Sequence, residues 1–353
     1  MDLRSIMGIY ILGRCMCKMV TLKDVAKSAG VHPSVVSRVV NNDDGLHIKE
    51  DTRRRILDTI KELNYRPNQS ARNLKKNETK MLGMVIPDFS NPVYASIIHG
   101  AEDQAAMENY NLLVYSMKQK GLKKNYFSHL LEDRIDGLLI ANSESDDTEI
   151  LELQKTNKPF VLVNRLINGI NNYVVLNDEL GGKLATKHLT ELGHKRIAHI
   201  TGPLFTGTGL RRFQGYRQGL READIEFNSS HVQESEYTVE SGYASMQKLL
   251  NLPELPTAIF ASNIMICLGA MRAIYDKGLS IPEDISIVGI HDTFFGSSLF
   301  PSLTTVKMPL YEMGAESVKK LIASIKGDER ENGQGLTIKE ASLIVRDSTR
   351  ELD

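Results

Sequence analysis

From residue 81 onward, short apolar runs alternate with longer segments whose apolar residues recur at helical spacing. The runs predict strands at 81–86, 112–115, 137–140, 160–163, 173–176, 196–200, 258–261 and 286–290. The segments between them predict helices at 94–108, 182–192, 212–222, 241–250 and 266–277. Such alternation favours parallel sheets covered by helices on both faces. The pattern is long enough for two such units, so an α/β architecture is expected over most of the chain.

The chain length and composition agree with a folded protein of more than one domain. It has 353 residues, of which 41% are hydrophobic and 25% charged, and this length favours two or more domains. Cys15, Cys17 and Cys267 form no disulfide framework, which suits a reducing cytoplasm. No apolar run reaches 18 residues. Residues 1–18 show no organised pattern, so we expect an extension without fixed structure or a start upstream of the native one.

Charge is divided unevenly along the chain. Residues 1–80 contain 16 Lys/Arg and 9 Asp/Glu, a net charge of +7, whereas the remainder contains 27 and 35, a net charge of −8. A small basic end on a large acidic body is typical of a protein whose one end meets a polyanion. A solvated charged face would give the same numbers, so the motifs must distinguish these alternatives.

Two short helices joined by a glycine turn are predicted near the N-terminus. Thr21 and Asp24 form a candidate capping box, and Gly30 precedes a second helix with Pro33 in its first turn. The second helix buries Val36, Val39 and Val40 and leaves hydroxyls and an arginine on its other face. This is the helix-turn-helix arrangement. A third helix, with its apolar stripe at Ile56, Ile60 and Leu63, ends before Pro67.

Four motifs in fixed order, VTLKDVAKSAGV, VSRVVNN, TRRRI and ELNYRPNQSARNL, resemble the LacI/GalR family of bacterial repressors. The resemblance covers the chain from residue 19 to its end. It implies a helix-turn-helix DNA-binding domain at 19–66, a hinge at 67–79, and an effector-binding and dimerisation domain at 80–353. The last would have two subdomains shaped like a periplasmic sugar-binding protein, about 80–176 with 307–326 and 177–306 with 327–353.

The resemblance also implies which residues contact DNA. In the headpiece they are Thr21, Leu22, Pro33, Ser34, Val35, Ser37, Arg38 and Asn41. Hydroxyls and arginine suit base edges or phosphates in the major groove, and a valine can touch a thymine methyl group. For Val35, packing against the headpiece core is an equal alternative. In the hinge the positions are Asn68, Ala71, Arg72 and Leu74, with Leu74 matching a leucine that wedges into the minor groove.

Polar residues at the carboxyl ends of the predicted strands suggest an effector site, because ligands of open α/β sheets lie there. The candidates are Tyr94, Arg165, Thr206, Thr208, Arg212, Tyr237, Asn263, His291 and Asp292. Arg212 matches an arginine that relatives use to hold ligand oxygens. Two positions depart from the family pattern: Ile264 and His291 stand where aspartates are usual. They put the common sugar chemistry in doubt, and we hypothesise that His291, neutral or cationic, selects a different ligand, such as an anionic metabolite.

No catalytic, metal or cofactor motif is present, because HExxH, G-x-S-x-G and a phosphate-binding glycine loop are absent and the histidines are scattered. We therefore expect no enzyme activity. The predicted function is a cytoplasmic, nucleoid-associated, homodimeric repressor that binds a pseudo-palindromic operator under control of a small-molecule effector, a sugar or related metabolite. The alternatives are a transporter's substrate-binding protein, which would have no use for residues 20–74, and a regulator controlled by a protein partner.

Overall fold

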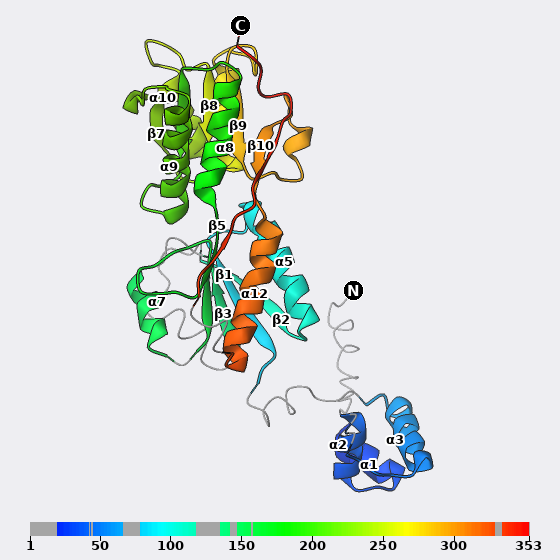
Figure 1. Cartoon of the computed structure of the whole chain (residues 1–353). Helices are drawn as coiled ribbons and strands as arrows, with labels where there is room; N and C mark the ends of the chain where they lie inside the picture. Colours follow the sequence, from blue (N-terminus) through cyan, green and yellow to red (C-terminus); the bar gives the residue numbers. More distant parts are fainter. Residues whose placement is uncertain are drawn as a thin grey trace, which may run out of the picture. The chain divides into compact units, whose positions relative to one another are not determined.

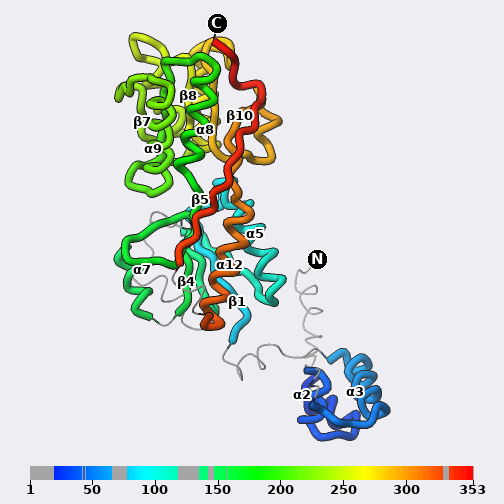
Figure 2. The backbone as a smooth tube through the Cα atoms, in the orientation of Figure 1, coloured from blue at the N-terminus to red at the C-terminus, as the bar shows by residue number. Residues whose placement is uncertain are grey.

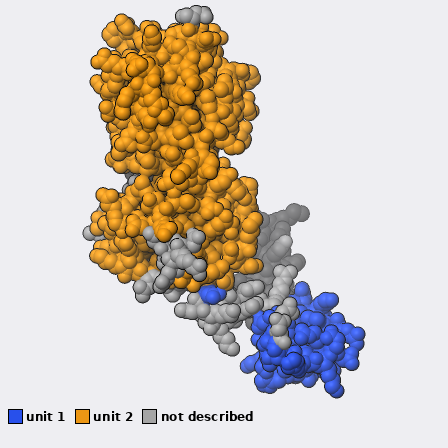
Figure 3. All heavy atoms as spheres, viewed as in Figure 1, with its two compact units in different colours: residues 1–78 blue, residues 79–353 orange. Residues whose placement is uncertain are grey.

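The computed structural model describes residues 20–41, 43, 45–65, 78–117, 135–141, 147–156, 158–328 and 334–352. The chain divides into two compact units, residues 1–78 and 79–353, which Figure 3 distinguishes by colour. The predicted N-terminal extension and the predicted hinge contacts Asn68, Ala71, Arg72 and Leu74 lie outside the described residues.

The first unit is a three-helix headpiece formed by α1 (Leu22–Ala29), α2 (Pro33–Val40) and α3 (Glu50–Glu62). The predicted capping box is present, because the Thr21 side chain accepts from the Asp24 amide while Asp24 accepts from the Thr21 amide. Gly30 ends α1 in the left-handed region at φ 65°, which glycine adopts without strain. A small core holds the helices together: Val25, Ala26, Ala29, Val36, Val39 and Ile56.

The second unit contains two six-stranded sheets (Figure 1). The first has the order β11-β5-β4-β3-β1-β2 and is parallel, with strands β1 (Met81–Ile86), β2 (Asn111–Ser116), β3 (Gly137–Ile140), β4 (Phe160–Val163), β5 (Tyr173–Leu176) and β11 (Leu336–Ile338). The second has the order β12-β10-β9-β8-β6-β7, with strands β6 (Ile197–Thr201), β7 (Val232–Glu234), β8 (Ala258–Ala261), β9 (Ser286–Ile290), β10 (Thr304–Lys307) and β12 (Ser342–Ile344). In this sheet β12 runs antiparallel to β10. The predicted α/β fold class is confirmed.

Helices flank each sheet. Those of the first sheet are α5 (Val93–Met107), α7 (Asp147–Gln154) and α12 (Leu310–Lys326), and those of the second are α8 (Asp178–Glu191), α9 (Gly207–Glu222), α10 (Val239–Leu249) and α11 (Ile264–Asp276). Short 3-10 turns lie at Ser229–His231 and Gly296–Ser298. Helices α8 and α9 approach closely, since a Cβ atom added at Gly215 would lie 2.1 Å from the Glu179 carbonyl oxygen. None of the helices in the described ranges is long and apolar enough to cross a membrane.

The chain passes between the two sheets three times, as the tube in Figure 2 shows. It leaves the first sheet after β5, returns between β10 and α12, and leaves again between β11 and β12. The sequence prediction assigned residues 327–353 to the second subdomain. This boundary was placed too early, because Leu336, Thr337 and Ile338 pair with β5 in the first sheet. The third passage therefore lies between Ile338 and Ser342.

Candidate functional site

Helix α2 presents a polar face to solvent. His32 caps its N-terminus by accepting from the Ser34 amide at 3.3 Å, and Pro33 occupies the first turn as predicted. Val36 and Val39 face the headpiece core, which fixes the rotation of the helix. The opposite face exposes Ser34, Arg38 and Asn41, with Ser37 half-buried. A helix with this arrangement of short polar side chains and one arginine fits the readout of a DNA groove.

The remaining headpiece candidates have structural contacts. Thr21 is exposed and caps α1, whereas Leu22 and Val35 are half-buried and pack against the headpiece core. For Val35 the packing alternative therefore describes this structure. Asn41 ends α2, and its amide side chain donates to the Ser37 hydroxyl at 3.5 Å.

Sequence reasoning missed a carboxylate beside the α2 arginine. The Arg38 Nε donates to Asp43 Oδ2 at 2.7 Å, and the two side chains are 46% and 39% exposed. The hydrogen bond from Arg38 holds the pKa of Asp43 below its ordinary value. No spacing rule would have identified this pair, because it depends on the path of the loop between α2 and α3.

At the carboxyl end of the second sheet, Arg212 of α9 lies in a buried polar cluster. Its Nε and Nη2 donate to Asp178 Oδ1 at 2.9 and 2.8 Å, and its Nη1 donates to the Ser262 carbonyl at 2.8 Å. Arg211 also donates to Asp178, through Nη2 at 2.5 Å. Arg212 is 2% exposed and Asp178 is fully buried. With one carboxylate and two guanidinium groups, this cluster carries one net positive charge.

His291 completes the cluster as a neutral group. Its Nε2 lies 2.9 Å from Arg212 Nη2, and because an arginine only donates, Nε2 must accept and the proton belongs on Nδ1. Burial, reinforced by the Arg212 charge, holds the pKa of His291 well below its ordinary value. Of the two forms that the sequence left open, the neutral imidazole is therefore the one that this site holds near neutral pH, so His291 offers no positive charge to an anionic ligand.

Two buried polar atoms beside Arg212, Ser262 Oγ and His291 Nδ1, have no hydrogen-bond partner within the described ranges. Buried polar atoms of folded proteins are normally paired with protein or with ordered water. Their position at the carboxyl ends of β8 and β9 is where a parallel sheet offers groups to a ligand.

A second group of candidates lies at the start of α9. Thr206 caps this helix by accepting from the Gly209 amide at 3.1 Å, and the Thr208 and Tyr237 hydroxyls are 3.1 Å apart. The Tyr237 ring occupies the space beside Gly202, where an added Cβ atom would lie 2.2 Å from the ring. The structure thus brings together three of the predicted effector residues, Thr206, Thr208 and Tyr237, beside the helix that carries Arg212.

Other predicted effector residues are engaged in the fold. Asn263 caps α11 by accepting from the Ile266 amide at 2.9 Å. Asp292 accepts from Arg346 Nη1 at 2.8 Å and from the Thr305 hydroxyl at 3.0 Å, so this carboxylate ties the C-terminal segment to β10. Tyr94 lies in α5 and Arg165 follows β4, beside the first sheet; the Tyr94 hydroxyl donates to the Ala141 carbonyl at 3.4 Å, and Arg165 pairs with Asp147.

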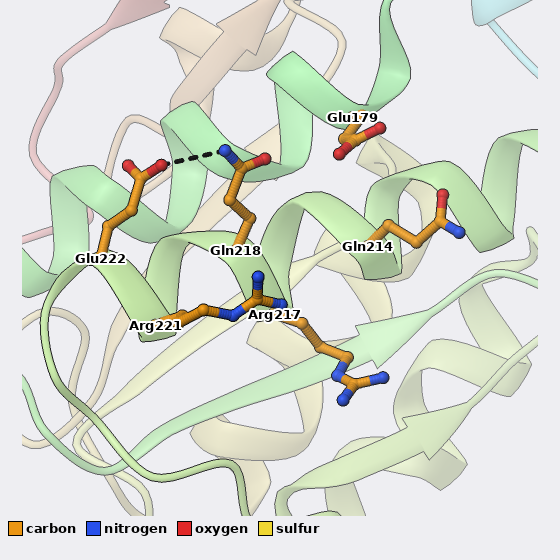
Figure 4. Close-up of a pocket in the computed structure, with 6 residues that line it drawn as sticks. All are labelled: Glu179, Gln214, Arg217, Gln218, Arg221 and Glu222. Atoms are coloured by element: carbon orange, nitrogen blue, oxygen red, sulfur yellow. Dashed lines mark hydrogen bonds between the residues drawn. The ribbon is translucent and has the colours of Figure 1, made fainter.

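A surface groove is lined by residues of α8 and α9 (Figure 4). Its lining carries both signs of charge: Glu179, Gln214, Arg217, Gln218, Arg221 and Glu222. Gln218 donates to Glu222 at 2.9 Å. None of the predicted effector residues lines this groove. In the described ranges no group of three or more His, Cys, Asp or Glu side chains is placed to hold a metal ion.

Comparison with known proteins identifies both parts of the chain. Residues 21–68 match the model of bacterial regulatory proteins of the lacI family, and residues 186–349 match the periplasmic binding protein-like domain. The HTH-type transcriptional repressor PurR of Mannheimia succiniciproducens is 36% identical over 95% of this chain and 100% of its own length. The repressor of the same name from Haemophilus influenzae strain PittEE is 38% identical over 87% of this chain and 91% of its own.

Solved structures agree with these matches. A lac repressor dimer bound to operator and the anti-inducer ONPF has a TM-score of 0.83 at 30% identity, covering 94% of this chain and 100% of that one. A complex of the transcriptional regulator CelR with cellobiose has a TM-score of 0.72 at 30% identity, covering 93% and 99%. A substrate-binding protein of a transporter and a regulator controlled by a protein partner are not favoured. The chain therefore belongs to the LacI family and is a DNA-binding transcriptional regulator.

Proposed function

We propose that the chain is a homodimeric repressor that places two copies of α2 in the major grooves of a pseudo-palindromic operator in the cytoplasm, and that a small molecule bound at the Arg212 cluster controls this binding. The observation that carries the proposal is the pairing of two features in one chain: a solvent-facing polar stripe on α2 and a buried, positively charged polar cluster at the strand ends of the second sheet.

On the DNA side, Ser34, Ser37 and Arg38 read base edges or phosphates. This role is supported by the fixed rotation of α2, whose valines lie in the headpiece core. The hinge prediction adds to this role: Leu74 enters the minor groove at the operator centre and kinks the duplex, and Asn68, Ala71 and Arg72 are the other hinge residues predicted to take part in DNA binding.

On the effector side, Arg212 and the rim formed by Thr206, Thr208 and Tyr237 bind a small polar molecule. Two buried atoms without a partner in the described part of the chain, His291 Nδ1 and Ser262 Oγ, lie in the same cluster. Among related structures, one regulator is described with cellobiose and one with ribose, which supports a sugar or a related metabolite. The net positive charge of the Asp178–Arg211–Arg212 cluster keeps an anionic metabolite among the candidates.

Control of DNA binding requires that the effector bind one conformation better than another, because equal affinity for two states shifts no equilibrium. The three chain passages between the sheets are the places where the two subdomains can move relative to each other. We propose that a ligand at the strand ends changes this arrangement and thereby the separation of the two headpieces in the dimer.

The test has two stages with the full-length protein. Selection from a randomised duplex library identifies the operator, and the enriched sequences should contain an inverted repeat. A thermal-shift screen of sugars, nucleosides and sugar phosphates then identifies a stabilising ligand, since binding to the native state raises the melting temperature. Thr208→Ala should weaken that stabilisation, whereas the control Gln214→Ala, on the outer face of the same helix, should not. Equal effects of the two variants would contradict the placement of the effector site.

A further inference from the structure

The Arg38–Asp43 pair has a geometry that bears on base recognition. Asp43 engages the Nε edge of the guanidinium group. Among the described residues, neither terminal nitrogen of Arg38 donates a hydrogen bond. These two nitrogens form an edge with which arginine can bind guanine O6 and N7 in a bidentate way. The carboxylate thus occupies the Nε position and leaves the edge formed by the two terminal nitrogens available for a base.

The position of Asp43 is itself fixed by the loop. Its amide donates to the Arg38 carbonyl at 3.1 Å, its Oδ1 accepts from the Gly45 amide at 3.0 Å, and its carbonyl accepts from the Leu46 amide at 3.0 Å. Leu46 and Ile48 then pack against the headpiece core. Three hydrogen bonds thus hold Asp43, one of them to its carboxylate, and provide a support for the long side chain of Arg38.

The electrostatics of the Arg38–Asp43 pair favours a role in DNA recognition over a role in stability. An exposed ion pair contributes little to folding, and a carboxylate on a surface that meets phosphates weakens DNA binding unless a cation neutralises it. Arg38 supplies that neutralisation to Asp43 through its hydrogen bond. The arrangement makes physical sense where it restricts the orientation of the arginine.

We propose that Asp43 is a specificity-determining positioning residue: it holds the Arg38 guanidinium with its terminal nitrogens directed toward a guanine in each half-site. This inference rests on the proposed role of Arg38 in reading base edges. Asp43 itself touches no base. Because Asp43 already restricts the Arg38 side chain, less conformational entropy is lost when Arg38 binds a base. We expect this restriction to increase the discrimination between bases more than it increases the overall affinity for DNA.

The experiment compares full-length variants by selection from a randomised duplex library, followed by affinity measurements on duplexes that differ at one position. Arg38→Ala should reduce the preference for guanine at one half-site position by about 10- to 100-fold, the range expected for a bidentate pair. Asp43→Asn should reduce the preference at the same position by roughly 3- to 10-fold, the effect of releasing one immobilised side chain. In the Arg38→Ala background, Asp43→Asn should have no further effect on that preference.

Asp51→Asn is the matched control. Asp51 pairs with Arg54 at 2.9 Å in the same headpiece, and the pair is also exposed. Removing this carboxylate changes the headpiece charge by the same amount, so it should alter affinity for all duplexes alike and leave base preference unchanged. Thermal melts of every variant check the fold, and Asp43→Ala provides a second substitution that removes both carboxylate oxygens.

The outcomes separate the two levels of the proposal. If Asp43→Asn raises affinity for all duplexes without changing base preference, Asp43 only repels DNA or sequesters Arg38, and the inference is overturned. If Arg38→Ala leaves base preference unchanged, the base-reading role of Arg38 fails and the inference fails with it. Loss of preference at the same position in both single variants, with no additional loss in the double variant, supports the proposal.

Discussion

Replacement of Arg212 by alanine should destabilise the effector unit through a charge left behind. Arg212 makes two hydrogen bonds to Asp178 and one to the Ser262 carbonyl, and it contacts His291. Its removal leaves the fully buried Asp178 carboxylate with Arg211 as its remaining cation. Breaking one side of a buried ion pair costs about 3–5 kcal/mol, because the desolvated partner is no longer compensated.

The assay is urea unfolding of the full-length protein at pH 7, followed by a probe of the effector unit. Arg211 offsets part of the loss, so the expected decrease in unfolding free energy is about 3 kcal/mol, at the lower end of that range. The double variant Asp178→Asn/Arg212→Ala should recover part of this loss, because the buried charge is gone. The headpiece should show no change in its own unfolding.

Two results would refute this reasoning. A loss below about 1 kcal/mol, the value typical of an exposed pair, would mean that the cluster is hydrated or differently arranged. A double variant that is no more stable than Arg212→Ala would mean that lost packing, and not the uncompensated charge of Asp178, causes the effect.

Three further predictions concern other parts of the molecule. Burial lowers the pKa of His199 from 6.5 to about 3. Below pH 6.5 the unfolded chain therefore binds a proton at this histidine that the folded chain does not bind. The contribution of His199 to the unfolding free energy is fully present above pH 6.5 and decreases as the pH falls. Unfolding free energy should drop by about 1.4 kcal/mol between pH 7.5 and 5.5 from this group, and His199→Gln should lessen the drop in urea titrations. Gly215→Ala should lower the unfolding free energy by about 1–3 kcal/mol, because the added methyl group forces α8 and α9 apart. Gly296→Ala should lower it by less, because an added Cβ atom there meets other atoms at 3.5 Å or more. Leu74→Ala should weaken operator binding while sparing most nonspecific, salt-dependent binding, and an equal loss of both in a salt titration would contradict the wedge.

Sequence patterns predicted the interior of the effector unit well. Six of the eight predicted strands match the observed bounds exactly, and the other two, β2 and β6, differ by one residue at each end, because buried parallel strands are continuous apolar runs. The patterns missed β7, β10, β11 and β12. Their sequences, VQE, TTVK, LTI and SLI, contain polar residues and form no continuous apolar run. The pairing of β11 with β5 is the reason that the subdomain boundary at 327 was wrong.

For the site, strand-end position and the family resemblance together pointed to Arg212, Thr208, Tyr237 and His291, because residues after parallel strands gather at one edge of a sheet; their role in effector binding stays a prediction. It did not predict their partners. Asp178 lies 34 positions from Arg212 and Ser262 lies 50 positions away, and no local spacing connects them.

Asp292 has a structural partner that its place in the sequence did not reveal. Its position beside His291 suggested an effector contact, which stays a prediction; in the structure His291 adopts φ 76°, and Asp292 pairs with Arg346 of the C-terminal segment. A change of backbone direction at a single residue thus separates two neighbours that the sequence treats alike.

One small molecule bound at the Arg212 cluster should change the affinity of the headpieces for their operator. The direct measurement is fluorescence anisotropy of a labelled, selected operator with and without the ligand found by thermal shift, for the unaltered protein and for Thr208→Ala. We expect the ligand to change the operator affinity of the unaltered protein by about fivefold or more, typical of allosteric coupling, and that of the variant by less. A ligand that stabilises the protein but leaves operator affinity unchanged would contradict this expectation.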